Sequence, residues 1–154
     1  MKKATKKERG CLEHAVDRGA LRVVIAEDHK MMRTLISELM TRHGFSVVGL
    51  AESGEDAIRL AGTVKPDVVL MDIDMPGMGG VAATPLVLQA APATRVVGLS
   101  SYSDKTTIDK MMAAGASAYV SKTMTMNSDL VATLRRISSR PRHHQNQKPM
   151  STGD

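Results

Sequence analysis

Acidic, hydroxyl and amine side chains stand at the ends of four apolar segments of this sequence. Glu27 and Asp28 follow LRVVIA, Asp72 follows DVVLM, Ser100 ends TRVVGLS, and Lys122 follows SAYVS. Carboxylates held close together repel one another, and a hard divalent cation such as Mg²⁺ relieves that repulsion through oxygen ligands. A lysine and a serine nearby can bind phosphoryl oxygens while one carboxylate attacks the phosphorus. These residue types therefore predict a site that moves a phosphoryl group.

The elements that would position these side chains are five short segments rich in Val and Ile. The predicted strands are residues 21–26, 45–51, 67–71, 94–100 and 117–121. Nearly continuous apolar runs of this length are typical of parallel strands buried on both faces. Segments of helical periodicity lie between them, which predicts an α/β fold with helices on both faces of a parallel sheet. Ligands of such sheets bind outside the carboxyl ends of the strands, where all four groups would meet.

Two of the predicted helices have informative sequences. The first has an apolar stripe made of Met32, Leu35, Ile36, Leu39 and Met40, and it is expected to stop at Gly44. The third lies within GVAATPLVLQAAP, where Pro85 would remove a backbone donor and clash one turn back unless it fell in the first turn. We therefore expect this helix either to start late or to be kinked at Pro85.

Composition and charge restrict the class of protein. The 154 residues suffice for one ordinary domain, no apolar run approaches the roughly 20 residues that cross a bilayer, and the single Cys11 fits a reducing compartment, so the cytoplasm is expected. Of the net charge of +5, residues 1–20 carry six Lys/Arg against three acids. We expect a basic N-terminal extension over 1–20, one domain over 21–139 and a disordered tail over 140–154.

Four stretches taken together, EDHKMMR, MDIDMPGMGG, VVGLSSY and GASAYVSK, closely resemble the receiver domain of two-component response regulators. The resemblance covers about residues 21–139 and implies a flavodoxin-like fold with strand order 2-1-3-4-5. It also implies a phosphoryl donor, which would be a histidine kinase or a histidine phosphotransfer protein, and an unidentified downstream protein target. Homodimer formation on phosphorylation is compatible with it.

The resemblance assigns a role to each residue of the predicted site. Asp72 matches the phosphorylated aspartate, and Glu27 and Asp28 match the acidic pair that holds Mg²⁺ together with Asp72 and the backbone carbonyl of Asp74. Ser100 and Lys122 match the residues that bind the phosphoryl group. The remaining matches are Tyr119, the aromatic switch residue, and Asp74 and Tyr102, at positions that tune phosphoryl lifetime.

The sequence departs from the family pattern in two places. Gly79 stands where an Asp is common, so the third helix lacks a side-chain N-cap at this position. The sequence is most like the subfamily whose larger members end in a helix-turn-helix, yet only 14 residues follow Arg140. We therefore expect no DNA-binding domain, and we expect a stand-alone receiver.

Three methionines are candidates for a surface that contacts the phosphoryl donor. Met31 lies off the apolar stripe of the first helix, and Met124 and Met126 are expected in the loop after Lys122. Both places border the predicted site. Methionine is also a common core residue, so packing is the plainer interpretation of most of the 12 methionines.

Two alternatives remain open at this point. A D-x-D motif after an apolar strand also resembles haloacid-dehalogenase-type phosphatases, but here Asp72 closes the third strand rather than the first and no G-D-x-x-x-D follows. A receiver-like interaction module that works without phosphorylation is the second alternative. The presence of all five site residues is evidence against it, because a module without the chemistry need not keep them.

Overall fold

The computed structural model of the chain describes residues 19–101, 104–123 and 126–139. Most of the expected N-terminal extension, the expected tail over 140–154, Tyr102 and Met124 lie outside the described residues. The domain boundaries at residues 20 and 139 therefore stay predictions.

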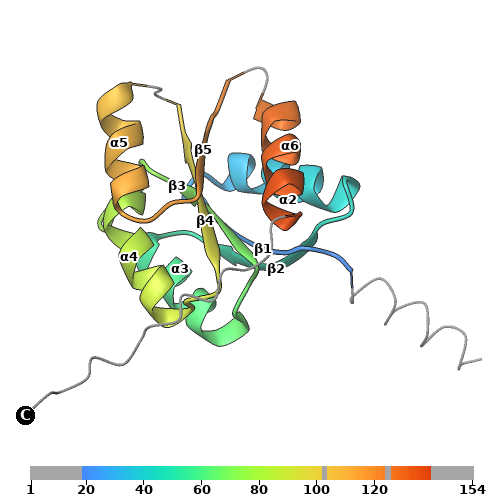
Figure 1. Ribbon diagram of the computed structural model, residues 1–154, viewed down its shortest axis with the longest axis horizontal. Coiled ribbons are helices and arrows are strands. Elements are labelled where there is room, and N and C mark those ends of the chain that lie inside the picture. The colour runs from blue at the N-terminus through green and yellow to red at the C-terminus, as the bar shows by residue number, and fades with distance from the viewer. Residues whose placement is uncertain (1–18, 102–103, 124–125, 140–154) are drawn as a thin grey trace, which may run out of the picture.

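A five-stranded parallel sheet with order β2-β1-β3-β4-β5 forms the centre of the molecule (Figure 1). The strands are β1 (Arg22–Ala26), β2 (Ser46–Ala51), β3 (Val68–Asp72), β4 (Arg95–Ser100) and β5 (Ala118–Ser121). The predicted fold and strand order are confirmed. Each strand begins one residue later than expected, and β3 extends to include Asp72 itself. The edge strand β2 is only half-buried along most of its length, because it lacks a neighbour on one side.

Five described helices cover the two faces of the sheet (Figure 1). α2 (Lys30–Arg42) and α6 (Met126–Ser138) pack on one face, where their apolar side chains meet those of β1, β3 and β4. α3 (Gly54–Val64), α4 (Gly80–Ala90) and α5 (Lys105–Ala113) cover the other face. The sheet is therefore buried from both sides, which explains the continuous apolar character of its central strands.

The helix α2 differs from its predicted stripe at two residues. Leu35 was expected to face the core, but it is 53% exposed, whereas Arg33 is buried. The reason is the narrow line of contact with the sheet, which Ile36, Leu39 and Met40 already fill. The helix ends at Arg42, and Gly44 follows with a φ of +83°, which glycine adopts without strain.

The helix α4 contains Pro85 in its interior. It begins at Gly80 and continues through Pro85, its sixth residue, so it does not start late. Gly79, at the N-cap, makes no side-chain cap, as expected. Gly80 is required for another reason, because a Cβ there would lie 2.3 Å from the carbonyl oxygen of Asp72.

Among the described helices, none has the length and the hydropathy that crossing a bilayer requires.

Candidate functional site

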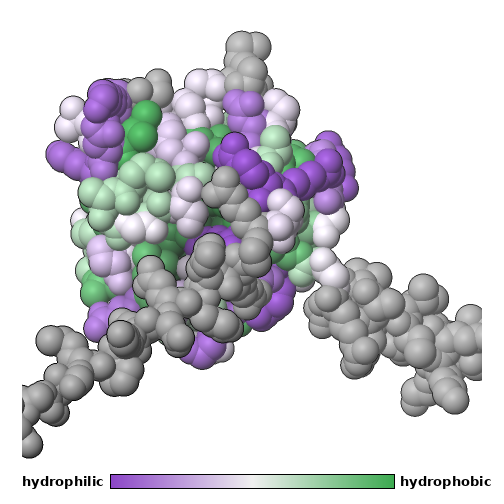
Figure 2. Space-filling view, viewed as in Figure 1, coloured by the Kyte–Doolittle hydropathy of each residue, from purple (hydrophilic) through white to green (hydrophobic). Residues whose placement is uncertain are grey.

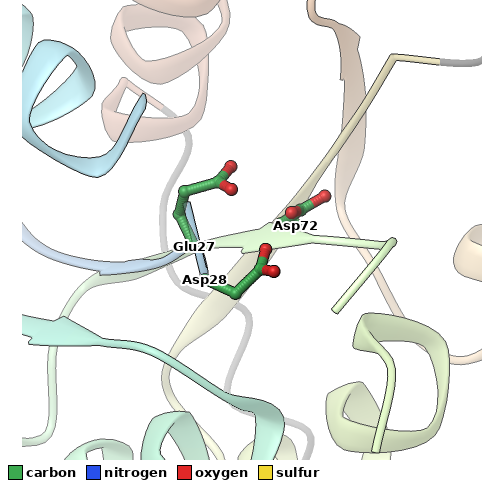
Figure 3. A group of neighbouring side chains, drawn as sticks. All are labelled: Glu27, Asp28 and Asp72. Carbon is green, nitrogen blue, oxygen red and sulfur yellow. The ribbon is translucent and has the colours of Figure 1, made fainter. Parts of the chain in front are cut away.

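Three carboxylates meet at the carboxyl end of the sheet (Figure 3). Asp72 is the last residue of β3, and Glu27 and Asp28 follow directly after the neighbouring strand β1. One carboxylate oxygen from each residue lies within 4.8 Å of the other two. Glu27 and Asp72 are buried, whereas Asp28 is exposed. The predicted convergence of these three side chains is therefore present.

Lys122 supplies the positive charge of this cluster. It follows β5, and its backbone N–H donates to the carbonyl oxygen of Ser100 at 2.8 Å, which aligns the ends of β4 and β5. Its ammonium donates to Glu27 Oε2 and forms an ion pair with Asp72 Oδ1 at 3.2 Å. The Lys122 side chain is only 8% exposed. One buried cation is thus shared between two buried carboxylates.

This crowding changes the pKa values of the buried groups. Burial raises the pKa of Asp72 to about 6, and repulsion by Glu27 adds to that effect while Lys122 opposes it. Burial alone would lower the pKa of Lys122, but its hydrogen bond to Glu27 and the attraction of both carboxylates raise it above its usual value. Near neutral pH, Asp72 is therefore mostly ionised and able to act as a nucleophile.

Ser100 and Asp74 are joined by a hydrogen bond. The hydroxyl of Ser100, fully buried at the end of β4, donates to Asp74 Oδ2 at 3.1 Å. The backbone N–H of Asp74 donates to Asp72 Oδ1 at 3.1 Å. Asp74 therefore contacts the site in two ways, through its own carboxylate and through its backbone.

Tyr119 lies in β5 beside these residues. It is half-buried, packs against the core on the α5 side of the sheet, and is hydrogen-bonded to Ser100. Burial raises the pKa of its hydroxyl above the usual value. The aromatic residue assigned to the switch thus contacts the serine assigned to the switch.

The three methionines proposed for donor contact have different environments. Met31 is 70% exposed on α2, and Leu35, one turn further along the helix, is exposed as well. Met124 lies outside the described residues. Met126 was wrongly placed in a loop: it is the first residue of α6 and is buried in the core between α6 and the sheet. Its apolar side chain packs in the core, which is evidence against a docking role.

Arg33 was not assigned a role from the sequence, yet it contacts the backbone of the site, and Glu52 contacts Arg33. The guanidinium of Arg33 is buried against the segment that carries Glu27 and Asp28, and it forms an ion pair of 3.0 Å with Glu52. An arginine four residues into a helix resembles any solvent-facing charge in sequence. The one signal in the sequence was the position of Arg33 on α2, which is not on the solvent-exposed side of that helix.

The oxygen atoms of the cluster suit Mg²⁺. This cation binds protein through one or two carboxylates and keeps several of its waters. Glu27, Asp28 and Asp72 offer carboxylate oxygens close enough together to share one ion, and the exposed Asp28 leaves room for water. The residues present therefore fit the cation that the sequence predicts.

A parallel sheet of this order, with an acidic cluster and a lysine at its carboxyl end, defines a receiver-type phosphoryl-acceptor domain. The chain belongs to the response regulator receiver domain family, whose sequence profile matches residues 23–135. This agrees with the resemblance deduced from the four motifs.

Individual relatives support the same assignment. The chain is 36% identical over 124 residues to the response regulator GacA of Pseudomonas aeruginosa, covering 80% of this chain and 58% of that protein. It is 38% identical over 117 residues to the response regulator protein VraR of Staphylococcus saprophyticus, covering 75% and 56%. Among solved structures, a LuxR-family two-component response regulator from Aurantimonas superposes with a TM-score of 0.75 at 31% identity, covering 80% and 89%. The chain spans about half the length of the curated relatives it matches.

Proposed function

We propose that this chain is a phosphoryl-accepting switch in which Asp72 is the acceptor. The observation that carries the proposal is the shared contact of Lys122 with both Glu27 and Asp72 beside the exposed carboxylate of Asp28. This arrangement places a nucleophile, a cation for phosphoryl oxygens and the ligands of a metal ion at one point. The donor is a histidine kinase or phosphotransfer protein of the cytoplasm, and the output is a downstream protein or a second copy of the chain.

The chain's own residues divide the chemistry among them. A carboxylate oxygen of Asp72 attacks phosphorus, the new P–O bond forms as the bond to the donor breaks, and the electron pair leaves with the donor. Bound Mg²⁺ would neutralise charge on the phosphoryl oxygens. Glu27 already accepts bonds at both oxygens, from the His29 N–H and from Lys122. Asp28 and Asp72 are therefore the carboxylates best placed to bind the cation directly, with the Asp74 carbonyl as a further ligand.

The signal follows from a change of partner by Ser100. In the unphosphorylated chain its hydroxyl donates to Asp74. A phosphoryl group on Asp72 offers a more highly charged acceptor, together with a new partner for Lys122. When Ser100 turns toward that group, its contact with Tyr119 changes as well, so the rearrangement reaches β5 and α5. We assign lifetime tuning to Asp74 on the same grounds, and Tyr102, outside the described residues, keeps that assignment from the family alone.

The direct test is intact-protein mass spectrometry after incubation with acetyl phosphate and Mg²⁺. We expect one added phosphoryl group on the wild-type chain and none when Mg²⁺ is removed by EDTA. A chain that hydrolysed acetyl phosphate over many turnovers without retaining the group would instead support the phosphatase alternative. An unmodified chain would support the phosphorylation-independent module.

Met31 is expected to contact the donor protein. It is exposed next to the site, and Leu35 extends the same apolar surface by one helical turn. Met31→Asp should slow phosphoryl transfer from a cognate donor by about tenfold, because a carboxylate buried in the contact without a partner costs more than about 1 kcal/mol. Transfer from acetyl phosphate should keep its wild-type rate, since that small donor does not need the surface.

The matched control for this prediction is Met112→Asp. Met112 is also exposed, at 42%, but it lies on α5 across the sheet from α2. Single-turnover transfer kinetics with the cognate donor protein and with acetyl phosphate distinguish a loss of docking from a loss of chemistry at the site. If Met31→Asp slowed both donors equally, the substitution would be acting on the site itself and the docking surface would be rejected.

A further inference from the structure

Arg33 is a buried charged residue of α2 that the proposed chemistry does not use. Its side chain is 10% exposed, although α2 has ample solvent-facing positions. Burying a guanidinium is costly unless its N–H groups find acceptors. The acceptors of Arg33 therefore show which part of the molecule it serves.

The acceptors of Arg33 are the backbone carbonyl groups of Glu27 and Asp28 and the side chain of Glu52, which directly follows β2. Arg33 Nη1 donates to the carbonyl oxygen of Glu27 at 2.8 Å and lies 3.4 Å from that of Asp28. Its Nη2 donates to Glu52 Oε1 at 3.0 Å. The Glu52 side chain is 73% exposed, so solvent screens its ion pair with Arg33. This ion pair is therefore weaker than the contact of Arg33 with the backbone carbonyl groups.

The segment from Glu27 to His29 is held from several directions, but only through its backbone and through Glu27. The Glu27 N–H donates to Ala51 O at 3.0 Å, and the Arg33 N–H donates to His29 O at 2.9 Å. Asp28 is different, because the described residues offer its exposed carboxylate no hydrogen bond or ion pair. The position of that carboxylate therefore depends on how its own peptide groups are fixed, and Arg33 lies against both flanking carbonyls.

We propose that Arg33 is a positioning residue for the Mg²⁺ site, an inference that rests on the proposed function. Its guanidinium clamps the two consecutive carbonyls of Glu27 and Asp28, so that the carboxylate of Asp28 stays near that of Asp72 before the cation arrives. The planar fork of an arginine can reach two backbone acceptors and a carboxylate together. A lysine at the same position keeps the charge but loses this geometry.

The test measures Mg²⁺ binding itself, by isothermal titration calorimetry, on the full chain and on Arg33→Lys and Arg33→Gln. We expect the Mg²⁺ Kd to rise about tenfold in both variants, the size of effect seen when a residue behind a metal ligand is lost. Because the chemistry is intact, phosphorylation by acetyl phosphate should return to the wild-type rate when Mg²⁺ is raised to saturation. Thermal unfolding in EDTA reports separately on any loss of stability.

Glu52→Gln is the control that isolates the carbonyl clamp, since it removes the ion pair and leaves the contacts to Glu27 and Asp28. Its Mg²⁺ Kd should stay within about twofold of wild type on that account. A wild-type Kd in Arg33→Lys, with or without a lower unfolding temperature, would overturn the inference and leave Arg33 a packing residue. If Arg33→Gln fails to fold, Arg33→Lys decides alone. A wild-type chain that binds no Mg²⁺ would refute the metal site of the proposed function, and this inference with it.

Discussion

Asp72→Asn is expected to abolish covalent phosphorylation and, in metal-free buffer, to make the folded chain more stable. The amide is not a nucleophile, so no phosphoryl group should appear on the variant. The stability gain follows from the raised pKa of Asp72, because the ionised carboxylate is less favourable in the buried site than in the unfolded chain. Under the proposed function, this loss of stability accompanies the negative charge that Asp72 needs to attack phosphorus.

The pH dependence of this gain has a defined sign. The pKa of Asp72 rises from 3.8 to about 6 on folding, so the folded chain binds the proton more tightly. The stabilising contribution of Asp72 to the free energy of unfolding is therefore greatest below about pH 4, and it is lost as the pH rises through about 6. At 1.36 kcal/mol per pKa unit, the advantage of Asp72→Asn should approach about 3 kcal/mol at neutral pH and vanish near pH 4.

Urea unfolding of both proteins across this pH range, in EDTA, is the measurement. The difference between the two unfolding free energies should grow from about pH 4 to about pH 7. A constant difference would mean that the gain has another source. A phosphoryl group that persists on Asp72→Asn would show that Asp72 is not the acceptor.

Lys122→Met is expected to have the opposite effect on stability. The substitution leaves Glu27, whose side chain is 2% exposed, and Asp72 without the cation that they share. Removing one partner of a buried ion pair costs about 3–5 kcal/mol. We expect the lower end, about 3 kcal/mol, because the two carboxylates can take up a proton in response. The variant should also lose the contact that holds the phosphoryl group.

Mg²⁺ should restore much of this lost stability, because it supplies the missing positive charge to the same carboxylates. Unfolding in urea with and without Mg²⁺ tests this directly. The matched control is Lys105→Met, in which the lysine side chain is 89% exposed and pairs with Asp109 one turn away. Such a surface pair contributes little, so the control should stay within about 0.5 kcal/mol of wild type. Equal losses in both variants would refute the shared-cation account of Lys122.

The fold and the core of the site were predictable because both depend on patterns that sequence preserves. Alternating apolar segments and helices predict the parallel sheet, and its topology brings the strand ends, with Asp72 and Lys122, to one edge. Ser100 was expected at the end of the fourth strand, and it is the last residue of β4. In these cases, sequence position alone determines where the side chain lies.

The misses concern residues whose environment depends on packing between elements. Leu35 fits the helical period but lies outside the contact between α2 and the sheet, and Met126 follows a strand but has already entered α6. Arg33 is hydrophilic by type, yet the bend of the chain after β1 presents two carbonyls to it. Periodicity gives the direction of a side chain on its own helix, and it does not give the width of the surface that the helix meets.

The hydroxyl of Ser100 has a single proton, and in the resting chain that proton is committed to Asp74. It cannot be given to a phosphoryl oxygen at the same time, so the two acceptors compete. A hydrogen bond to a charged acceptor contributes about 1.5 kcal/mol, which corresponds to roughly a tenfold bias toward the resting arrangement. Under the proposed function, we therefore expect the population of the switched arrangement without phosphorylation to depend partly on Asp74, a residue that the phosphoryl group itself need never touch.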